Sequence, residues 1–128
     1  MSERPSAAKY TKTHEWVLVD GEIATVGITD FAVEHLGELV FIDLPDVGAT
    51  VEVDETVAEV ESVKAVGEVK SPAAGEVTSV NEALTDDQGP LASDPFGAGW
   101  LFTVALQSLS DDLLDLAAYE QLLESESV

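Results

Sequence analysis

One lysine is the residue in this chain best placed to do chemistry. The 128 residues include only five cationic side chains against 26 carboxylates, for a formal net charge of -21. Lys64 is the only lysine or arginine between Thr13 and Val69, and it lies in an apolar and acidic stretch. A lysine amine is usually charged and a poor nucleophile, yet an exposed lysine on a tight turn is a good target for covalent modification. Spacing alone favours a surface lysine paired with Glu61 or Glu68.

The composition indicates a folded chain whose charge limits its partners. Hydrophobic residues make up 45% of the sequence, enough for a core, and 128 residues suit one domain. No cysteine is present, so any sulfur redox chemistry has to come from an attached group. Two histidines are too few to indicate a zinc site. The negative charge argues against nucleic acids and anionic membranes as partners.

No segment of the sequence indicates export or membrane insertion. The first eight residues lack the apolar run of a signal peptide. No stretch approaches the roughly 20 apolar residues needed to cross a bilayer. We therefore expect a cytoplasmic protein. Many acids and few lysines suit a salt-rich cytoplasm, because charge repulsion is screened beyond roughly 3 Å in about 1 M salt, so we also expect a halophilic source.

The elements that position Lys64 are short strands joined by turns. Apolar runs bounded by turn residues predict strands over four segments: 13–19, 22–28, 38–44 and 100–106. Asp20-Gly21 is a two-residue hairpin signal between the first two of these strands. Further short strands continue to about residue 80, and 85–95 is expected to be a long loop. The pattern predicts a mainly β fold, a sandwich or flattened barrel, with Lys64 on a hairpin.

Two helical segments are predicted beside these strands. Thr29 or Asp30 is a candidate N-terminal cap for a short helix near 30–36. Ser110 is a candidate cap for a C-terminal helical segment over 111–124, whose leucine-rich face is expected to dock onto the domain rather than bind a partner.

Seven short segments closely resemble the H-protein family of the glycine cleavage system. They are residues 10–16, 27–32, 35–38, 61–65, 71–77, 80–84 and 99–101, in this order. The resemblance implies a lipoyl/biotinyl-type barrel-sandwich hybrid built from two small sheets. On this basis the chain divides into a flexible N-terminal arm (1–9), a lipoyl-carrier domain (10–124) and a flexible tail (125–128).

The resemblance also implies a function for Lys64. In that family, the lysine of the Glu-Ser-Val-Lys-Ala segment carries lipoic acid in amide linkage, and here this lysine is Lys64. The implied protein is a monomeric carrier and not an enzyme, so no catalytic or metal site is expected. It would shuttle an aminomethyl group from glycine decarboxylase, a pyridoxal phosphate enzyme, to a tetrahydrofolate-dependent aminomethyltransferase. It would pass electrons to the FAD enzyme dihydrolipoyl dehydrogenase, and a lipoate-attaching enzyme would be a fourth partner.

The carried amine needs a cleft that excludes water and offers a carboxylate. The family's acidic residue beside a histidine and a tryptophan corresponds to Glu15, with the hydroxyl of Thr13 nearby. A second acidic position, four residues after the lysine, corresponds to Glu68. We expect His14 and His35 to satisfy the fold rather than line a docking surface.

Three other interpretations compete with a lipoyl carrier of glycine cleavage. Biotin carriers flank their lysine with methionines, whereas Val63 and Ala65 flank Lys64. Lipoyl domains of 2-oxoacid dehydrogenase-type complexes lack the His-Glu-Trp start found at 14–16. An unmodified acidic interaction module would carry no group on the lysine at all.

The charge predicts that thermal stability depends strongly on salt. Raising KCl from about 0.1 M to about 3 M should raise the Tm by at least about 5 °C, because screening removes repulsion among the carboxylates. Melting followed by circular dichroism at both concentrations tests this, with sucrose as a control for solute exclusion without screening. Equal Tm values in low and high KCl would contradict the halophilic interpretation.

Overall fold

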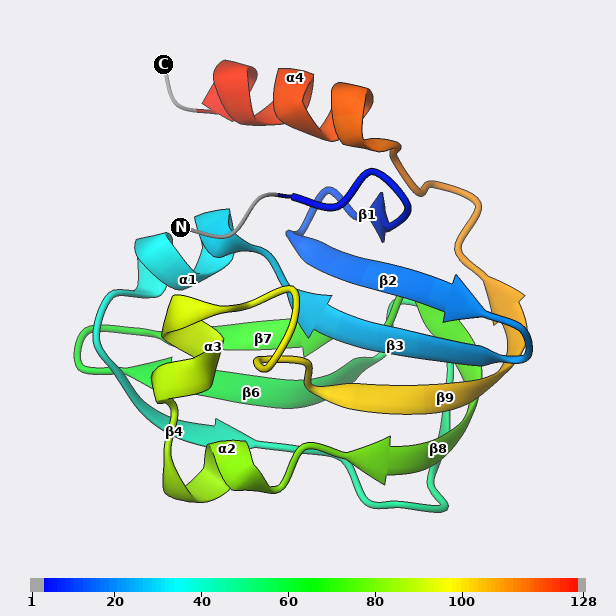
Figure 1. The fold of residues 1–128 in the computed structure, drawn as a ribbon, viewed down its shortest axis with the longest axis horizontal. Coiled ribbons are helices and arrows are strands. Elements are labelled where there is room, and N and C mark those ends of the chain that lie inside the picture. Colours follow the sequence, from blue (N-terminus) through cyan, green and yellow to red (C-terminus); the bar gives the residue numbers. More distant parts are fainter. Residues whose placement is uncertain (1–3, 127–128) are drawn as a thin grey trace.

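Two antiparallel sheets pack against each other in the computed structural model, which describes residues 4–126 (Figure 1). The larger sheet has the strand order β1 (Lys9–Tyr10), β2 (Glu15–Asp20), β3 (Ile23–Ile28), β9 (Phe102–Leu109), β8 (Ala73–Val80) and β5 (Thr50–Val51). The smaller sheet has the order β4 (Leu39–Asp43), β6 (Thr56–Ser62) and β7 (Val66–Lys70). Within the described residues the sheets do not close into a barrel. This mainly β, two-sheet architecture confirms the predicted fold class.

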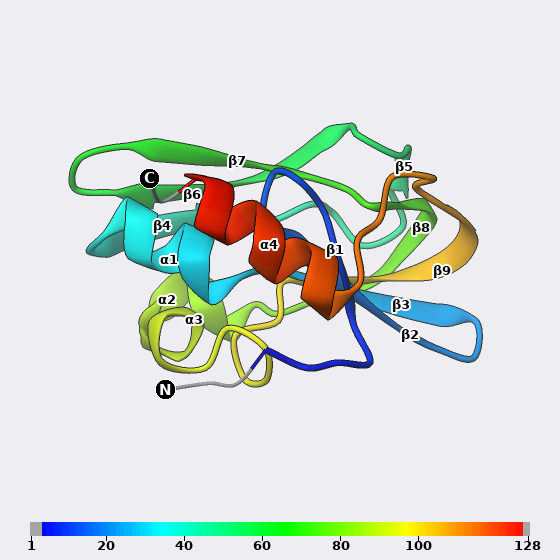
Figure 2. The ribbon, with the colours of Figure 1, turned by 90° about the horizontal axis from the view of Figure 1, so that it is seen from above.

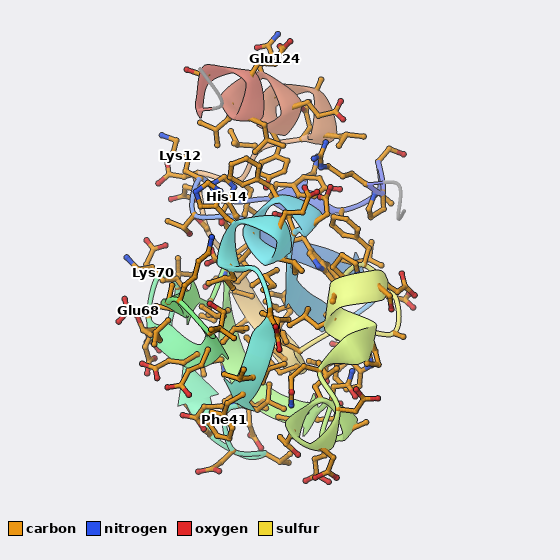
Figure 3. The ribbon with its side chains drawn as sticks, turned by 90° about the vertical axis from the view of Figure 1, so that its left-hand side faces the viewer. Lys12, His14, Phe41, Glu68, Lys70 and Glu124 are labelled. Carbon is orange, nitrogen blue, oxygen red and sulfur yellow. The ribbon has the colours of Figure 1, made fainter. Side chains whose placement is uncertain are left out.

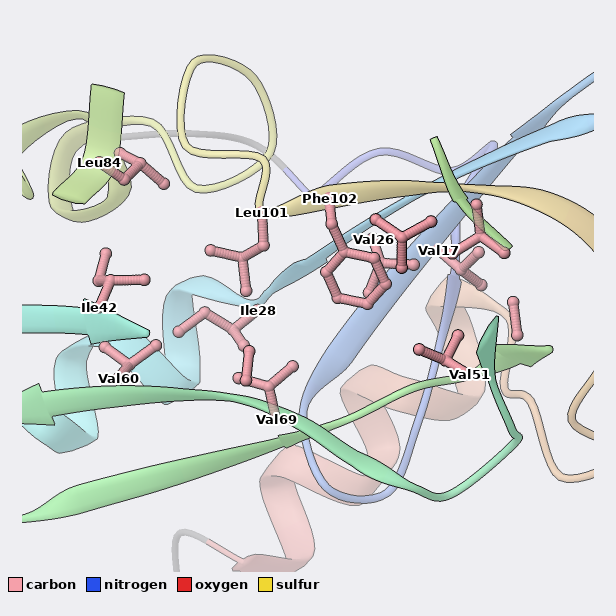
Figure 4. Close-up of a cluster of buried hydrophobic side chains, with 14 of the residues drawn as sticks. Val17, Val26, Ile28, Ile42, Val51, Val60, Val69, Leu84, Leu101 and Phe102 are labelled. Atoms are coloured by element: carbon pink, nitrogen blue, oxygen red, sulfur yellow. The ribbon is translucent and has the colours of Figure 1, made fainter. Parts of the chain in front are cut away.

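The main core lies between the two sheets (Figure 4). In β6 the buried residues are Ala58, Val60 and Ser62, every second position, as expected for a strand with one face inward. Ile42 and Val69 contribute from the neighbouring strands of the small sheet. Each fully buried aliphatic side chain of this kind stabilises the fold by about 1.5–3 kcal/mol. The small sheet that carries the lysine hairpin is therefore anchored along its inner face.

Four helices complete the described part of the fold: α1 (Asp30–Leu36), α2 (Ala83–Asp86), α3 (Gly89–Ser93) and α4 (Leu116–Glu126). Thr29 caps α1, and its hydroxyl accepts a hydrogen bond from the Ala32 amide at 3.3 Å. The short helix near 30–36 and its cap are therefore confirmed. No helix in the described part of the chain combines the length and apolarity needed to span a bilayer.

A second buried cluster joins α4 to the outer face of β2. Along β2, Trp16 points away from the core side of the sheet and packs with Tyr10 and Tyr119. The rings of Tyr10 and Tyr119 stack with their centroids 4.7 Å apart. Figures 1 and 2 show α4 lying above β1 and crossing over it. The predicted docking of the C-terminal helix onto the domain is confirmed.

Two boundaries differ from the sequence prediction. The expected loop at 85–95 contains α3 and the end of α2, because buried Leu84 and Leu91 anchor these short helices to the core. The C-terminal helix begins at Leu116 and not near 111. The preceding backbone is drawn into the sheet instead, because Leu114 exchanges two hydrogen bonds with Tyr10, at 2.7 and 2.8 Å.

The N-terminal segment contacts both α1 and α4. The Arg4 guanidinium donates two hydrogen bonds to Asp30, at 2.9 and 3.0 Å, and one to Glu120 at 3.3 Å. Ala8 is fully buried. Residues 1–3 and 127–128, which belong to the predicted arm and tail, lie outside the described residues. The division into arm, domain and tail stays a prediction.

Candidate functional site

Lys64 is exposed at the tip of the hairpin that joins β6 to β7. Its side chain passes over the end of α1, since a Cβ atom at Gly37 would lie 3.6 Å from Lys64 Cε. It makes no ion pair with Glu61 or Glu68 among the described residues. The paired surface lysine favoured by spacing alone is therefore wrong, and the amine is displayed to solvent.

The Ser62 hydroxyl holds the hairpin tip in one shape. Its Oγ accepts hydrogen bonds from the amides of Lys64 at 3.3 Å and Ala65 at 3.1 Å, and it donates to the Ala65 carbonyl at 3.2 Å. The Val63 amide donates to the Glu38 carbonyl at 3.0 Å. A serine that bonds backbone groups two and three residues ahead replaces the missing ladder bonds of a turn. The lysine is therefore presented from an ordered backbone.

A cleft of about 220 Å³ opens beside this hairpin, between the turn before β2, helix α1 and strand β7. Most of its wall is apolar, and its polar and aromatic residues come from all three elements. These are Thr13, His14, Glu15, Phe31, His35 and Glu68. Figure 3 shows His14 beneath α4, with Glu68 and Lys70 along the β7 side. Leu36 and Gly67 also line the cleft. Leu36 ends α1 and packs over Gly67 of β7, and the next residue, Gly37, lies near the Lys64 side chain.

The Glu15 carboxylate is the polar centre of this cleft, although the residue is only 1% exposed. Its Oε1 atom accepts hydrogen bonds from the hydroxyls of Thr11, at 2.6 Å, and Thr13. Its Oε2 atom accepts one from the Lys70 amide at 3.3 Å. Glu15 starts β2, so alternation along the strand turns its side chain to the inner face, opposite to Trp16.

Burial raises the pKa of Glu15 above its ordinary value of 4.5, because a charged carboxylate loses water there. The hydrogen bonds from Thr11, Thr13 and the Lys70 amide oppose this rise, as does the positive charge of Lys70. The cleft therefore contains a carboxylate whose negative charge is only partly compensated by the protein. A cation that entered the cleft would supply the missing compensation.

The other residues singled out from the sequence, namely Thr13, Glu68 and the two histidines, all line the cleft. Thr13 contacts Glu15 directly, and Glu68 lies on the exposed rim of the cleft. Both histidines form part of the cleft wall. Both rings pack against the same aromatic side chain. The centroid of the Phe31 ring lies 4.6 Å from that of His14 and 5.2 Å from that of His35. They therefore serve the fold by shaping this cleft.

Sequence reasoning missed three contributors to the site. Thr11 holds Glu15 twice, since its hydroxyl also accepts from the Glu15 amide at 3.0 Å. Phe31 forms the aromatic wall; its i, i+4 spacing from His35 was the available signal. Tyr119 contacts His14 from 105 residues away, and no local pattern indicates such a contact.

Comparison with known proteins places this fold and site in context. Residues 8–126 match the family model described as "Glycine cleavage H-protein". The chain is 51% identical over 124 residues to the glycine cleavage system H protein of Beutenbergia cavernae, covering 95% of this chain and 98% of that protein. It is 46% identical to the one from Nitratidesulfovibrio vulgaris, covering 96% and 97%. A crystal structure of a glycine cleavage system H protein from Mycobacterium marinum superposes with a TM-score of 0.87 at 39% identity, covering 98% and 100%.

The fold defines a lipoyl-type domain, in which a hairpin displays one lysine beside a cleft. More particularly, the chain belongs to the glycine cleavage H-protein family. It is accordingly a lipoyl carrier of the glycine cleavage system, bears lipoate covalently on a lysine, and is not itself an enzyme. The resemblance seen in the seven sequence segments is thereby confirmed.

Replacing Ser62 by alanine should loosen the hairpin tip. Loss of the Oγ contacts leaves the amides of Lys64 and Ala65 without their acceptor, which costs about 1–3 kcal/mol locally. We expect amide hydrogen exchange at these two residues to speed up by about tenfold. NMR-detected exchange measures this.

Ser71→Ala is the matched control. Ser71 is buried, and its hydroxyl accepts from the Ala73 amide at 3.3 Å and donates to the Ala73 carbonyl at 2.5 Å, in a turn away from the lysine. It should lower overall stability without changing exchange at Lys64. Equal exchange in the Ser62→Ala variant and the unsubstituted chain would show that Ser62 does not order the tip.

The raised pKa of Glu15 predicts a specific pH dependence of stability. The folded state binds this proton more tightly than the unfolded state, so the free energy of unfolding falls as pH rises between the two pKa values. Glu15→Gln has no such proton. The free energy of unfolding of the unsubstituted chain minus that of Glu15→Gln should therefore fall as pH rises from below 4.5 through the raised pKa. Urea unfolding across this range in high KCl measures the difference, and a rising difference would contradict the assignment.

Proposed function

We propose that Lys64 is the lysine that carries lipoate, and that the cleft beside it shelters the carried group. The observation that carries this proposal is the placement of one displayed amine next to a buried carboxylate. Lys64 is exposed on a hairpin pinned by Ser62, and the cleft with Glu15 opens between that hairpin and α1. The attached lipoate would supply a dithiolane that takes up a small group and two electrons.

The cleft suits an amine attached to such an arm. Apolar side chains such as Leu36 and Val69 form much of its wall, and they exclude water from the centre. Each carboxylate oxygen has two acceptor positions. Oε1 of Glu15 uses both, for Thr11 and Thr13, whereas Oε2 has one protein donor, the Lys70 amide. One acceptor position on Oε2 therefore remains for an ammonium group.

Three residues have distinct parts in this proposal. Glu15 would accept the ammonium hydrogen bond and balance its charge. Thr13 would keep the carboxylate oriented, since it donates to the other oxygen. Glu68, exposed on the rim, would attract the cation to the entrance without being buried with it.

We further propose four protein partners for the displayed lysine. They are glycine decarboxylase with pyridoxal phosphate, the tetrahydrofolate-dependent aminomethyltransferase, dihydrolipoyl dehydrogenase with FAD, and the lipoate-attaching enzyme. Family membership supports the set, and the absence of cysteine supports a redox role that resides in the attached group. Val63 and Val66, on either side of the hairpin tip, are 70% and 55% exposed, so the tip is open to large partners. The carrier would act as a monomer.

We also propose that the protein works in a cytoplasm of high salt. The small sheet supports this, because Asp43, Glu59 and Glu68 are direct partners across three strands and form one row of carboxylates. Like charges placed directly opposite destabilise a sheet unless salt screens them. The net charge of -21 points in the same direction.

Substitution of Lys64 by arginine tests the attachment site. In a host that makes or is supplied with lipoate, the unsubstituted chain should show the mass increment of one lipoyl amide. Lys64→Arg should show the bare chain mass while remaining folded, because arginine keeps the charge but cannot form this amide. Intact-mass spectrometry and circular dichroism measure the two quantities.

Lys70→Arg is the matched control for this experiment. Lys70 ends the strand that follows the hairpin, so it is another lysine in the same region. The Lys70→Arg variant should keep the lipoyl increment. An increment that persisted in Lys64→Arg, or that disappeared in Lys70→Arg alone, would move the attachment site away from Lys64.

A further inference from the structure

The Tyr119 hydroxyl joins two walls of the cleft from outside it. Tyr119 lies on α4 and is fully buried. Its oxygen is 2.9 Å from Nδ1 of His14, in the turn before β2, and 2.7 Å from Oγ1 of Thr29, the cap of α1. His14 and helix α1 both line the cleft, so one phenol contacts two of the elements that form it.

One assignment of the protons satisfies all the contacts among Tyr119, His14, Thr29 and the Ala32 amide. A phenol has one proton and can donate to only one neighbour. If Tyr119 donates to Nδ1 of His14, the Thr29 hydroxyl can donate to the Tyr119 oxygen while it accepts from the Ala32 amide. The opposite order would leave the buried Thr29 proton without an acceptor among its contacts. In the first arrangement Nδ1 of His14 is the acceptor and carries no proton.

His14 depends on an external contact for its conformation. Its backbone φ is +74°, in the left-handed region that side-chain-bearing residues rarely adopt. Such a conformation persists where surrounding interactions determine it. Several are visible here. The His14 amide donates to the Thr11 carbonyl at 3.2 Å, and its carbonyl accepts from the Thr29 amide at 3.0 Å. Its ring packs with its centroid 4.6 Å from that of Phe31, and its Nδ1 meets the Tyr119 hydroxyl. Glu15 is the next residue, so the backbone conformation at His14 also orients the Glu15 carboxylate.

We propose that Tyr119 is a positioning residue for the cleft, and that its hydroxyl ties His14 to the first turn of α1. The C-terminal helix thereby reinforces the contact between His14 and α1, which the Thr29 amide also makes through the His14 carbonyl, and helps to set the direction of Glu15. This goes beyond docking of α4, because the stack of Tyr119 on Tyr10 already anchors the helix without touching the cleft. The inference rests on the proposed shelter function for its consequence, but the positioning itself is a property of the unmodified chain.

The first test uses the unmodified chain and Tyr119→Phe, which removes the hydroxyl and keeps the ring. Nitrogen NMR of the His14 ring reports which nitrogen carries the proton. We expect Nδ1 to be the unprotonated nitrogen in the unsubstituted chain, and this preference to be lost in Tyr119→Phe. The Ala32 amide donates a hydrogen bond to the Thr29 hydroxyl. Its hydrogen exchange should speed up by about tenfold in the same variant.

Tyr10→Phe is the matched control, because it removes a hydroxyl from the other ring of the same stack. The Tyr10 hydroxyl donates to the Pro5 carbonyl at 2.5 Å and does not contact the cleft. This variant should leave the His14 tautomer and Ala32 exchange unchanged. The proposal is overturned if Tyr119→Phe leaves both readouts at the values of the unsubstituted chain, or if Tyr10→Phe alters them equally.

The second test separates this inference from the proposed function. The lipoylated chain is loaded with the carried amine, and the half-life of the loaded form is measured for the unsubstituted chain, Glu15→Gln, Tyr119→Phe and Tyr10→Phe. Tyr119→Phe should shorten the half-life by about tenfold, as expected for a misplaced carboxylate, and Tyr10→Phe should not. If Glu15→Gln has no effect, the shelter proposal fails. If Glu15→Gln shortens the half-life and Tyr119→Phe does not, the positioning inference alone fails.

Discussion

A buried carboxylate places the main demand on this structure. Glu15 has lost nearly all its water, and a charge in that position is tolerated only where donors surround it. The fold supplies two threonine hydroxyls from the preceding turn and one amide from the last residue of β7. That last donor belongs to the small sheet, so the carboxylate also links the two sheets at their common edge. The remaining acceptor position on Oε2 is what makes the arrangement suited to binding.

The hairpin and the cleft have separate parts in the proposed function. The hairpin has an ordered tip that displays the lysine, and the cleft beside it offers a largely apolar interior. Ser62 fixes the backbone of the tip, so the lysine amine extends from a defined point while its own side chain stays solvent-exposed. The cleft is formed by elements that do not move with that arm. A tethered group held near a preformed site has a high effective concentration there, which favours sheltering without strong intrinsic binding. Under the proposed function, the folded domain would need no large motion to exchange its cargo between cleft and partner.

The carboxylates on the outer surface and the carboxylate in the cleft differ in their surroundings. The row formed by Asp43, Glu59 and Glu68 is repulsive and reaches solvent, with Glu59 half-buried and the other two exposed. Glu15, in contrast, is buried and hydrogen-bonded. Salt screens the exposed row but reaches the buried carboxylate much less. The sequence contains so many acidic residues that composition alone does not single out Glu15. Burial separates Glu15 from the carboxylates that reach solvent. Only the three-dimensional structure makes that distinction visible.

Local chemistry explains which elements were predicted well. The turn at Asp20-Gly21 and the cap at Thr29 each depend on residues adjacent in sequence, so β2, β3 and α1 follow directly. The predicted start of the C-terminal helix was wrong because Leu114 pairs with Tyr10, a long-range contact that overrides the capping signal at Ser110.

The sequence by itself determined the lysine, the hairpin that displays it and the β character of the domain, because turn residues, alternation and a single isolated cation act over a few positions. It also pointed to Glu15 and Thr13 through a resemblance to a family. Tertiary structure alone decided that Thr11 completes the carboxylate's hydrogen bonds, that the two histidines share Phe31, and that Tyr119 reaches His14. Such contacts join residues up to 105 positions apart, and they arise from how sheets and helices pack rather than from any local pattern.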